Sequence, residues 1–196
     1  MYKKQMTAQR VICLLSIIAS VIVFLYSLGL MTDLYDSLYP TMLNPYDLTD
    51  TDVPGSIIYY DMQPFNRALL RVSIGLILLS CLLFITNTNV RRKYYVGNYA
   101  AVAVVAAGGA AFSVWAHGEI EMYKAQFLQI NFEELAANAA KKKSLYTEST
   151  FWFDAHYVVF GLLLLGIALL IANVIWKRKL MKEERALIEQ GKGAAA

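Results

Sequence analysis

The stretch AAVAVVAAGGAA, residues 100–111, contains no side chain larger than valine, and it lies in an uncharged run from residue 94 to residue 118. A run of this length predicts a transmembrane helix, because about 20 apolar residues cross the hydrocarbon core of a bilayer. In lipid, small side chains let the backbones of neighbouring helices approach closely. The stretch therefore predicts a membrane helix that packs against other helices.

The whole chain has the composition of a membrane protein. Its 196 residues are 58% hydrophobic and 17% charged, whereas soluble domains average about 25% charged residues. The first apolar run is longer than the roughly 7–15 apolar residues of a cleavable signal peptide, and we expect it to be a retained anchor. The sequence thus predicts an all-α polytopic protein, with one four-helix transmembrane domain over residues 1–196. The predicted spans are residues 11–31, 72–89, 94–117 and 155–176.

The charged residues predict an orientation. Residues 1–10, 90–93 and the tail 177–196 hold 12 of the 18 lysines and arginines but only three acids. Segments 32–71 and 118–154 hold the other six basic residues and 12 acids. Because lysine and arginine mark cytoplasmic loops, we expect both termini in the cytoplasm and the two acidic segments outside. The basic total then reflects topology and anionic lipid, and nucleic acid is not an expected partner.

The first outer segment contains all four prolines of the chain, which interrupt helices. We expect consecutive turns over residues 43–55 and a short extended or helical piece over residues 56–60. Arg67 and Arg71 follow at the outer boundary of the second span, four residues apart on one helical face. They can reach lipid headgroups as interface anchors, or they can pair with acids of this segment or of a partner.

The second outer segment and the tail are predicted to be helical. The third span should continue as a helix through residue 129, and Asn131 with Glu134 resembles a capping box for a new helix over residues 132–146. We expect this segment to stand on the outer face as a helical hairpin. Tail residues 177–190 should extend the fourth span.

The small residues of the third span are candidates for helix packing, and they surround much of the helix. Two explanations stay open, and both can hold together: the span lies at the centre of a tight four-helix bundle, or it docks onto transmembrane subunits of another protein. The candidate packing residues are Ala103, Ala106, Ala107, Gly108, Ala110 and Ala111. Three tryptophans near span ends, Trp115, Trp152 and Trp176, are expected interface anchors.

Several functional classes are disfavoured. No span carries an acidic or basic residue in its middle, which argues against self-contained secondary transport and against a wet pore. Cys13 and Cys81, the two cysteines, both lie within spans, so the outer segments cannot hold a disulfide framework.

One group of side chains could carry chemistry, at the outer ends of the third and fourth spans. Histidines and carboxylates can bind zinc or act in acid–base catalysis. The pairs His117/Glu119 and Asp154/His156, however, lack the spacing that puts ligands on one helical face. We therefore assign no catalytic residue, metal or cofactor, with His117, His156 and Asp154 as the nearest candidates for metal ligands. The full group is His117, Glu119, Glu121, Asp154 and His156.

Four blocks of the chain resemble a family of uncharacterised small four-span proteins that some Gram-positive bacteria encode beside the permease genes of carbohydrate ABC importers. The blocks are MTDLYDSLYPTM (31–42), DVPGSIIYYDMQPFNRALLRVSIGLILLSCLLFITNTNVRRKYYVGNY (52–99), SVWAHG (113–118) and FWFDAHYVVF (151–160). The resemblance implies an accessory subunit in the bacterial cell membrane, attached to the importer's permeases. It carries no catalytic motif and no family site residues.

The resulting expectation is a non-enzymatic subunit that docks on a membrane transport complex and stabilises or regulates it. Its expected partners are the permeases and membrane lipid, with the ATPase and the solute-binding protein as further candidates. The alternative is a free-standing membrane enzyme that uses the interfacial histidine and carboxylate group. A homo-oligomeric channel is a third reading, which the apolar spans disfavour.

Overall fold

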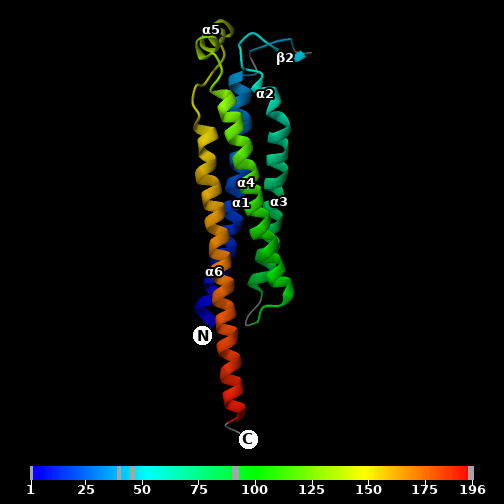
Figure 1. Ribbon diagram of the computed structural model, residues 1–196, viewed down its shortest axis with the longest axis vertical. Coiled ribbons are helices and arrows are strands. Elements are labelled where there is room, and N and C mark those ends of the chain that lie inside the picture. The colour runs from blue at the N-terminus through cyan, green and yellow to red at the C-terminus, as the bar shows by residue number, and fades with distance from the viewer. Residues whose placement is uncertain (1, 39–40, 45–46, 90–92, 194–196) are drawn as a thin grey trace. The chain divides into compact units, whose positions relative to one another are not determined.

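Helices dominate the computed structural model, which describes residues 2–38, 41–44, 47–89 and 93–193. The long helices are α1 (Tyr2–Leu38), α3 (Gln63–Thr88), α4 (Val96–Phe127) and α6 (Phe151–Gly193) (Figure 1). Among the described residues, four helical segments are long and apolar enough to cross a membrane. The prediction of a helical chain with four segments able to cross a membrane is confirmed.

The helices extend beyond the predicted spans where the sequence indicated that they should. Helix α4 continues without a break to Phe127, and α6 continues through the tail to Gly193. The turn between α3 and α4 is short, and the Asn98 side chain supports it by donating to the Thr86 carbonyl and accepting from the Tyr95 amide, both at 2.8 Å. Two basic residues of this predicted cytoplasmic turn, Arg91 and Arg92, lie outside the described residues.

The prediction of consecutive turns over residues 43–55 is wrong in part. Strands β1 (Met42–Asn44) and β2 (Asp47–Thr51) pair antiparallel, with Met42 opposite Thr51 and Asn44 opposite Asp47. None of the four prolines lies within these two strands, so none removes a hydrogen-bond donor from the ladder. The expected short piece after the strands is helical, as α2 (Ile58–Asp61).

The predicted cap of the second outer segment is confirmed. Helix α5 (Phe132–Lys142) begins after Asn131, whose side chain accepts a hydrogen bond from the Glu134 amide. The helix ends before residue 146, earlier than predicted, because Lys143 takes a left-handed conformation with φ of 53°. The amides of Lys143 and Ser144 both bond to the Ala139 carbonyl, which closes the helix.

Helix α5 packs on the turn that follows β2. One carboxylate oxygen of Asp52 accepts from the Lys142 ammonium at 3.0 Å and from the side-chain amide of Asn138. The Asn131 amide donates to the Pro54 carbonyl at 3.4 Å. The two segments predicted to lie outside the membrane are therefore joined to each other.

Gly55 makes this packing possible, and we expect Gly55→Ala to lower the free energy of unfolding by about 1–2 kcal/mol, the cost of a left-handed conformation for other residues. Its φ is +85°, and a Cβ atom there would lie 3.2 Å from the Cα atom of Ile130. Chemical denaturation of the full-length chain in detergent measures the loss. Wild-type stability of the variant would contradict the contact.

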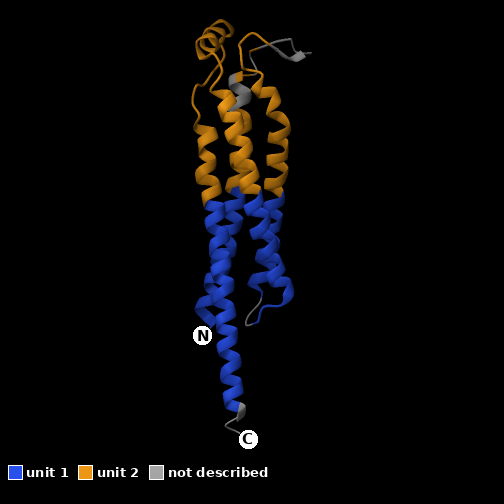
Figure 2. Ribbon diagram, in the orientation of Figure 1, with its two compact units in different colours: residues 1–21, 75–111, 162–196 blue, residues 22–74, 112–161 orange. Residues whose placement is uncertain are grey.

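The chain divides into two compact units, and each contains part of every long helix (Figure 2). Unit 1 comprises Met1–Val21, Gly75–Ala111 and Leu162–Ala196. Unit 2 comprises Ile22–Ile74 and Phe112–Gly161.

Unit 1 has an apolar core and a buried polar network. The core contains Cys13, Leu83, Val102, Val105 and Leu170. The network centres on Gln5, which is 0% exposed. Gln5 donates to Gln9 at 2.8 Å and to Asn173 at 3.0 Å, and it accepts from the Lys177 ammonium at 3.1 Å. The ammonium also lies over the rings of Tyr2 and Tyr94, 5.1 and 5.4 Å from their centroids.

Helix α4 buries only one face in unit 1, which does not fit the first of the two explanations, a position at the centre of a tight bundle. Val102, Val105 and Gly109 follow one another at helical spacing and are buried. A Cβ atom at Gly109 would lie 2.9 Å from the Ile167 side chain, so α4 and α6 approach closely there. The small residues on the exposed side of α4 do not pack on another helix among the described residues of this chain.

Unit 2 is held together by aromatic side chains. Phe65 packs on Trp115 and Tyr123, with ring centroids 5.4 and 5.7 Å apart. Phe160 contacts Phe112 and Tyr26 edge to face, at 5.6 and 6.1 Å. These contacts join the unit 2 parts of α1, α3, α4 and α6, and they form the frame of the site described next.

Candidate functional site

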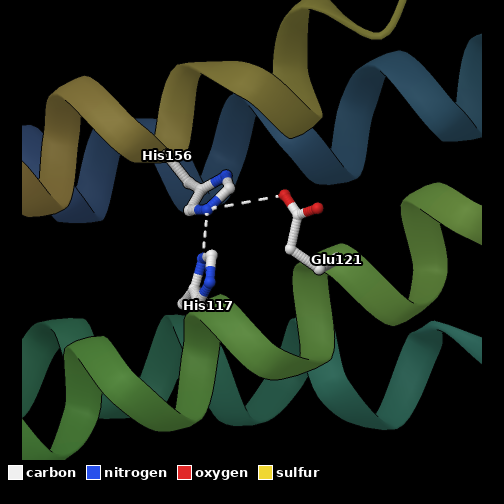
Figure 3. A group of neighbouring side chains, drawn as sticks. All are labelled: His117, Glu121 and His156. Atoms are coloured by element: carbon white, nitrogen blue, oxygen red, sulfur yellow. Dashed lines mark hydrogen bonds and ion pairs between the residues drawn. The ribbon is translucent and has the colours of Figure 1, made fainter.

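Two histidines and a glutamate come together in unit 2. His117 and Glu121 lie one helical turn apart on α4, so their side chains leave the same face of the helix. His156 lies on α6, and the three side chains point toward one another (Figure 3). Their possible metal-ligating atoms all lie within 4.8 Å of one another.

His156 lies at the centre of the group. Its Nε2 atom is 2.8 Å from His117 Nδ1 and 3.8 Å from Glu121 Oε1. Its Nδ1 atom faces the Phe153 carbonyl oxygen. Because a carbonyl can only accept, His156 carries a proton on Nδ1, and in its neutral form it presents the Nε2 lone pair to the other two side chains. His117 Nδ1–H then donates the hydrogen bond between the rings.

The group is closed on one side and open on the other. His156 is 1% exposed and its ring packs against Phe160, with centroids 5.6 Å apart. His117 is exposed, and the Glu121 side chain is 36% exposed. The Tyr157 hydroxyl donates to Glu121 Oε1 at 2.9 Å and holds the carboxylate in place. A small ion or proton donor can therefore reach the group from the His117 side.

Asp154, a candidate from the sequence, does not belong to this group. One of its oxygens pairs with the Lys124 ammonium at 2.5 Å, and the other accepts from the Thr150 hydroxyl at 2.6 Å. Both carboxylate oxygens are thus engaged on another side of α6. Glu119, two residues from Glu121 on α4, is also outside the group.

The sequence contains a spacing that places two of these three residues together. The pairs His117/Glu119 and Asp154/His156 lack a helical spacing, but His117 and Glu121 are separated by four positions. That spacing places two possible ligands on one helical face. The third ligand comes from a helix that is distant in sequence, which no spacing rule could indicate.

The other predicted residues occupy several environments. The candidate packing residues Ala103, Ala107, Gly108 and Ala111 are exposed, whereas Ala106 and Ala110 are half-buried. The predicted anchors Arg67, Arg71, Trp115 and Trp176 are exposed, and Trp152 is half-buried against Gly29. The acidic side chains of segments 33–36 and 47–50, which could pair with the two arginines, lie outside the described side chains.

Two imidazoles and a carboxylate in this arrangement can do one of two things. They can pass a proton along the hydrogen bond between the rings, with Glu121 stabilising positive charge on His156. They can also supply two nitrogen ligands and one oxygen ligand to a metal ion. Both require His156 Nε2 to face the other two groups, as it does here.

In comparisons with known proteins, no family model, no curated protein and no solved structure matches the chain. The class defined by fold and site is a helical protein with four helical segments able to cross a membrane and a histidine–glutamate group between two of its helices.

Proposed function

We propose that this protein is a non-enzymatic accessory subunit that docks on the transmembrane permeases of a carbohydrate ABC importer and stabilises or regulates the complex. The observation that carries the proposal is the exposed small-residue face of α4. This face consists of Gly97, Ala100, Ala103, Ala107, Gly108 and Ala111, all of which are exposed.

The face has the chemistry of a helix–helix interface. Lipid solvates leucine as well as a protein interior does, so a face that meets only lipid gains nothing from glycine and alanine. Small residues allow close backbone approach by another helix. A Cβ atom added at Gly108 would have no atom within 4 Å, whereas the adjacent Gly109 is packed against Ile167. The space outside Gly108 is therefore available to a partner.

A shallow apolar groove continues the face toward α3 in unit 1. It is lined by Leu79, Leu82, Thr86, Gly97, Ala100, Ala101, Val104 and Val105. A transmembrane helix of a permease suits such a surface in shape and polarity. A lipid acyl chain is the competing occupant.

The orientation of the chain in the membrane and the choice of a carbohydrate importer are inferred from the sequence. The basic residues of the termini and of the α3–α4 turn support cytoplasmic termini in a bacterial cell membrane. In that orientation the end of α6 could reach an ATPase subunit, and α5 could touch a solute-binding protein. The resemblance to proteins encoded beside carbohydrate importer permeases supports the choice of importer.

The histidine–glutamate group favours a second candidate function, that of a membrane enzyme using His117, Glu121 and His156. Replacing both histidines by alanine separates the two functions. An enzyme would lose activity while its assembly stayed intact, whereas an accessory subunit would retain both assembly and transport.

The docking proposal predicts a different effect for each of two adjacent glycines: loss of assembly at Gly108 and loss of stability at Gly109. Gly108→Leu fills the space available to a partner, so we expect it to abolish co-purification with the permeases while leaving the stability of the isolated chain unchanged. Gly109→Leu forces α4 away from Ile167, so we expect it to destabilise the isolated chain by about 1–3 kcal/mol or more, the cost of overpacking. Co-purification from native membranes and denaturation in detergent measure the two effects.

Gly161→Leu on α6 is the matched control, because Gly161 is exposed and an added Cβ there meets no atom within 4 Å. It should affect neither assembly nor stability. If Gly108→Leu co-purifies with the permeases like the wild type, the proposed α4 interface is wrong. If the wild-type chain is isolated without permeases, the importer assignment fails.

A further inference from the structure

The His117–Glu121–His156 group has a second property that is independent of docking by α4. We propose that these three side chains bind one divalent transition-metal ion of the Zn²⁺ class and leave a fourth position for water or for a ligand from a partner. Two histidines with one glutamate form a known ligand set for zinc sites that keep an open position.

The distances fit a metal ion after small side-chain rotations. With zinc–nitrogen bonds of about 2.0–2.1 Å and tetrahedral geometry, two ligand atoms lie roughly 3.3 Å apart. His117 Nδ1 and His156 Nε2 are 2.8 Å apart, and Glu121 Oε1 is 3.8 Å from His156 Nε2. These two separations bracket the required value, and all three ligand atoms lie within 4.8 Å of one another. An ion would take the place of the proton that the two rings share.

Neighbouring groups already orient the ligands. The Phe153 carbonyl accepts from His156 Nδ1–H, which fixes the tautomer whose Nε2 atom is free to bind metal. The Tyr157 hydroxyl donates to Glu121 Oε1, the same oxygen that lies 3.8 Å from His156 Nε2, and so orients it toward the site. Supporting bonds of this kind to ligand histidines and carboxylates accompany most metal sites.

A cation suits the electron-rich atoms of this group. Nε2 of neutral His156 accepts from His117 Nδ1–H, and a carboxylate oxygen of Glu121 lies 3.8 Å from the same nitrogen. A metal ion binds both electron-rich atoms at once and keeps the imidazole neutral. Exposed His117 provides the entry path.

The ligand chemistry selects the ion. Imidazole nitrogens with one carboxylate suit zinc and the neighbouring first-row divalent ions better than Ca²⁺ or Mg²⁺, which prefer oxygen ligands alone. The site contains no thiolate, because both cysteines lie elsewhere in the sequence.

The test is a metal titration of the full-length chain, purified in detergent with a tag that contains no histidine and stripped of metal with a chelator. We expect equilibrium dialysis to give one Zn²⁺ per chain. Co²⁺ should compete for the same site and produce the visible absorption bands of a low-symmetry site with nitrogen ligands. Absence of saturable binding by the wild-type chain would overturn the proposal.

Variants identify the ligands. Glu121→Gln and His117→Ala should weaken Zn²⁺ binding by more than about 100-fold, beyond the roughly 10–100-fold cost of losing a supporting partner. Both positions are partly or fully exposed, and circular dichroism checks that the variants stay folded. Glu119→Gln is the matched control, since it removes the same charge two residues away and should bind Zn²⁺ like the wild type. Equal losses of Zn²⁺ affinity in Glu119→Gln and Glu121→Gln would show that the effect comes from the general negative charge of the surface. This result would overturn the assignment of Glu121 as a ligand.

Discussion

Replacing Gly29 by alanine is expected to lower the free energy of unfolding by about 1–3 kcal/mol, the usual cost of an added carbon in a packed interior. Gly29 lies in the unit 2 part of α1, and a Cβ atom there would overlap the indole ring of Trp152 on α6. The indole is rigid, so it must move as a whole and disturb its edge contact with Phe151, where the ring centroids are 5.4 Å apart. Denaturant titration in detergent, followed by tryptophan fluorescence, measures the loss.

Gly118→Ala is the control for this prediction. Gly118 lies in the same unit on α4, and an added Cβ atom there meets no atom within 4 Å. Alanine should be neutral or stabilising at this position, by up to about 1 kcal/mol, because it favours helix more than glycine does. The additional change Trp152→Leu should recover part of the Gly29→Ala loss. Equal stability of Gly29→Ala and Gly118→Ala would show that α1 and α6 do not meet at Gly29.

Replacing Gln5 by leucine is expected to have a comparably large effect on unit 1. The substitution removes three buried hydrogen bonds, including the one that Gln5 accepts from the Lys177 ammonium at 3.1 Å. A bond to a charged group alone contributes about 1.5–3 kcal/mol, so we expect a loss of at least that size. Thermal and denaturant unfolding in detergent, followed by circular dichroism, measure it.

The same network offers a rescue and a control. Changing Lys177 to methionine in the Gln5→Leu background removes the buried charge and should restore part of the lost stability, since an apolar pair can replace a buried polar pair. Gln190→Leu, at an exposed position of α6 in unit 1, should change stability by no more than about 0.5 kcal/mol. Similar losses in Gln5→Leu and Gln190→Leu would contradict the central place of Gln5.

The network consists of residues that no sequence pattern marks. Lys177 is one of the basic tail residues that predict the orientation, yet it is 0% exposed. Gln5, Gln9 and Asn173 are single amides near span ends, and such residues have no pattern of their own. Residues 5 and 173 are hydrogen-bonded although they lie 168 positions apart. Only the packing of α1 on α6 brings them together.

For the candidate metal group, too, one part can be predicted from the sequence and another part depends on the tertiary structure. The positions of His117 and Glu121 on one helical face follow from their spacing alone. That His156 completes the group, whereas Asp154 turns to Lys124, depends on how α6 is rotated against α4 in unit 2. Hydropathy does not encode that rotation.

The sequence by itself determined the existence of the four long helices, the capping of α5 by Asn131 and the extension of α4 and α6 beyond the apolar spans. These features depend on local chemistry, in which hydropathy, spacing and capping residues act over a few turns. The tertiary structure alone decided which face of α4 is covered, which glycines meet a neighbour, and which polar side chains find one another. Those outcomes depend on contacts between residues far apart in the chain. The rotation of α4 about its axis decides that Gly109 is buried and that the adjacent Gly108 is exposed.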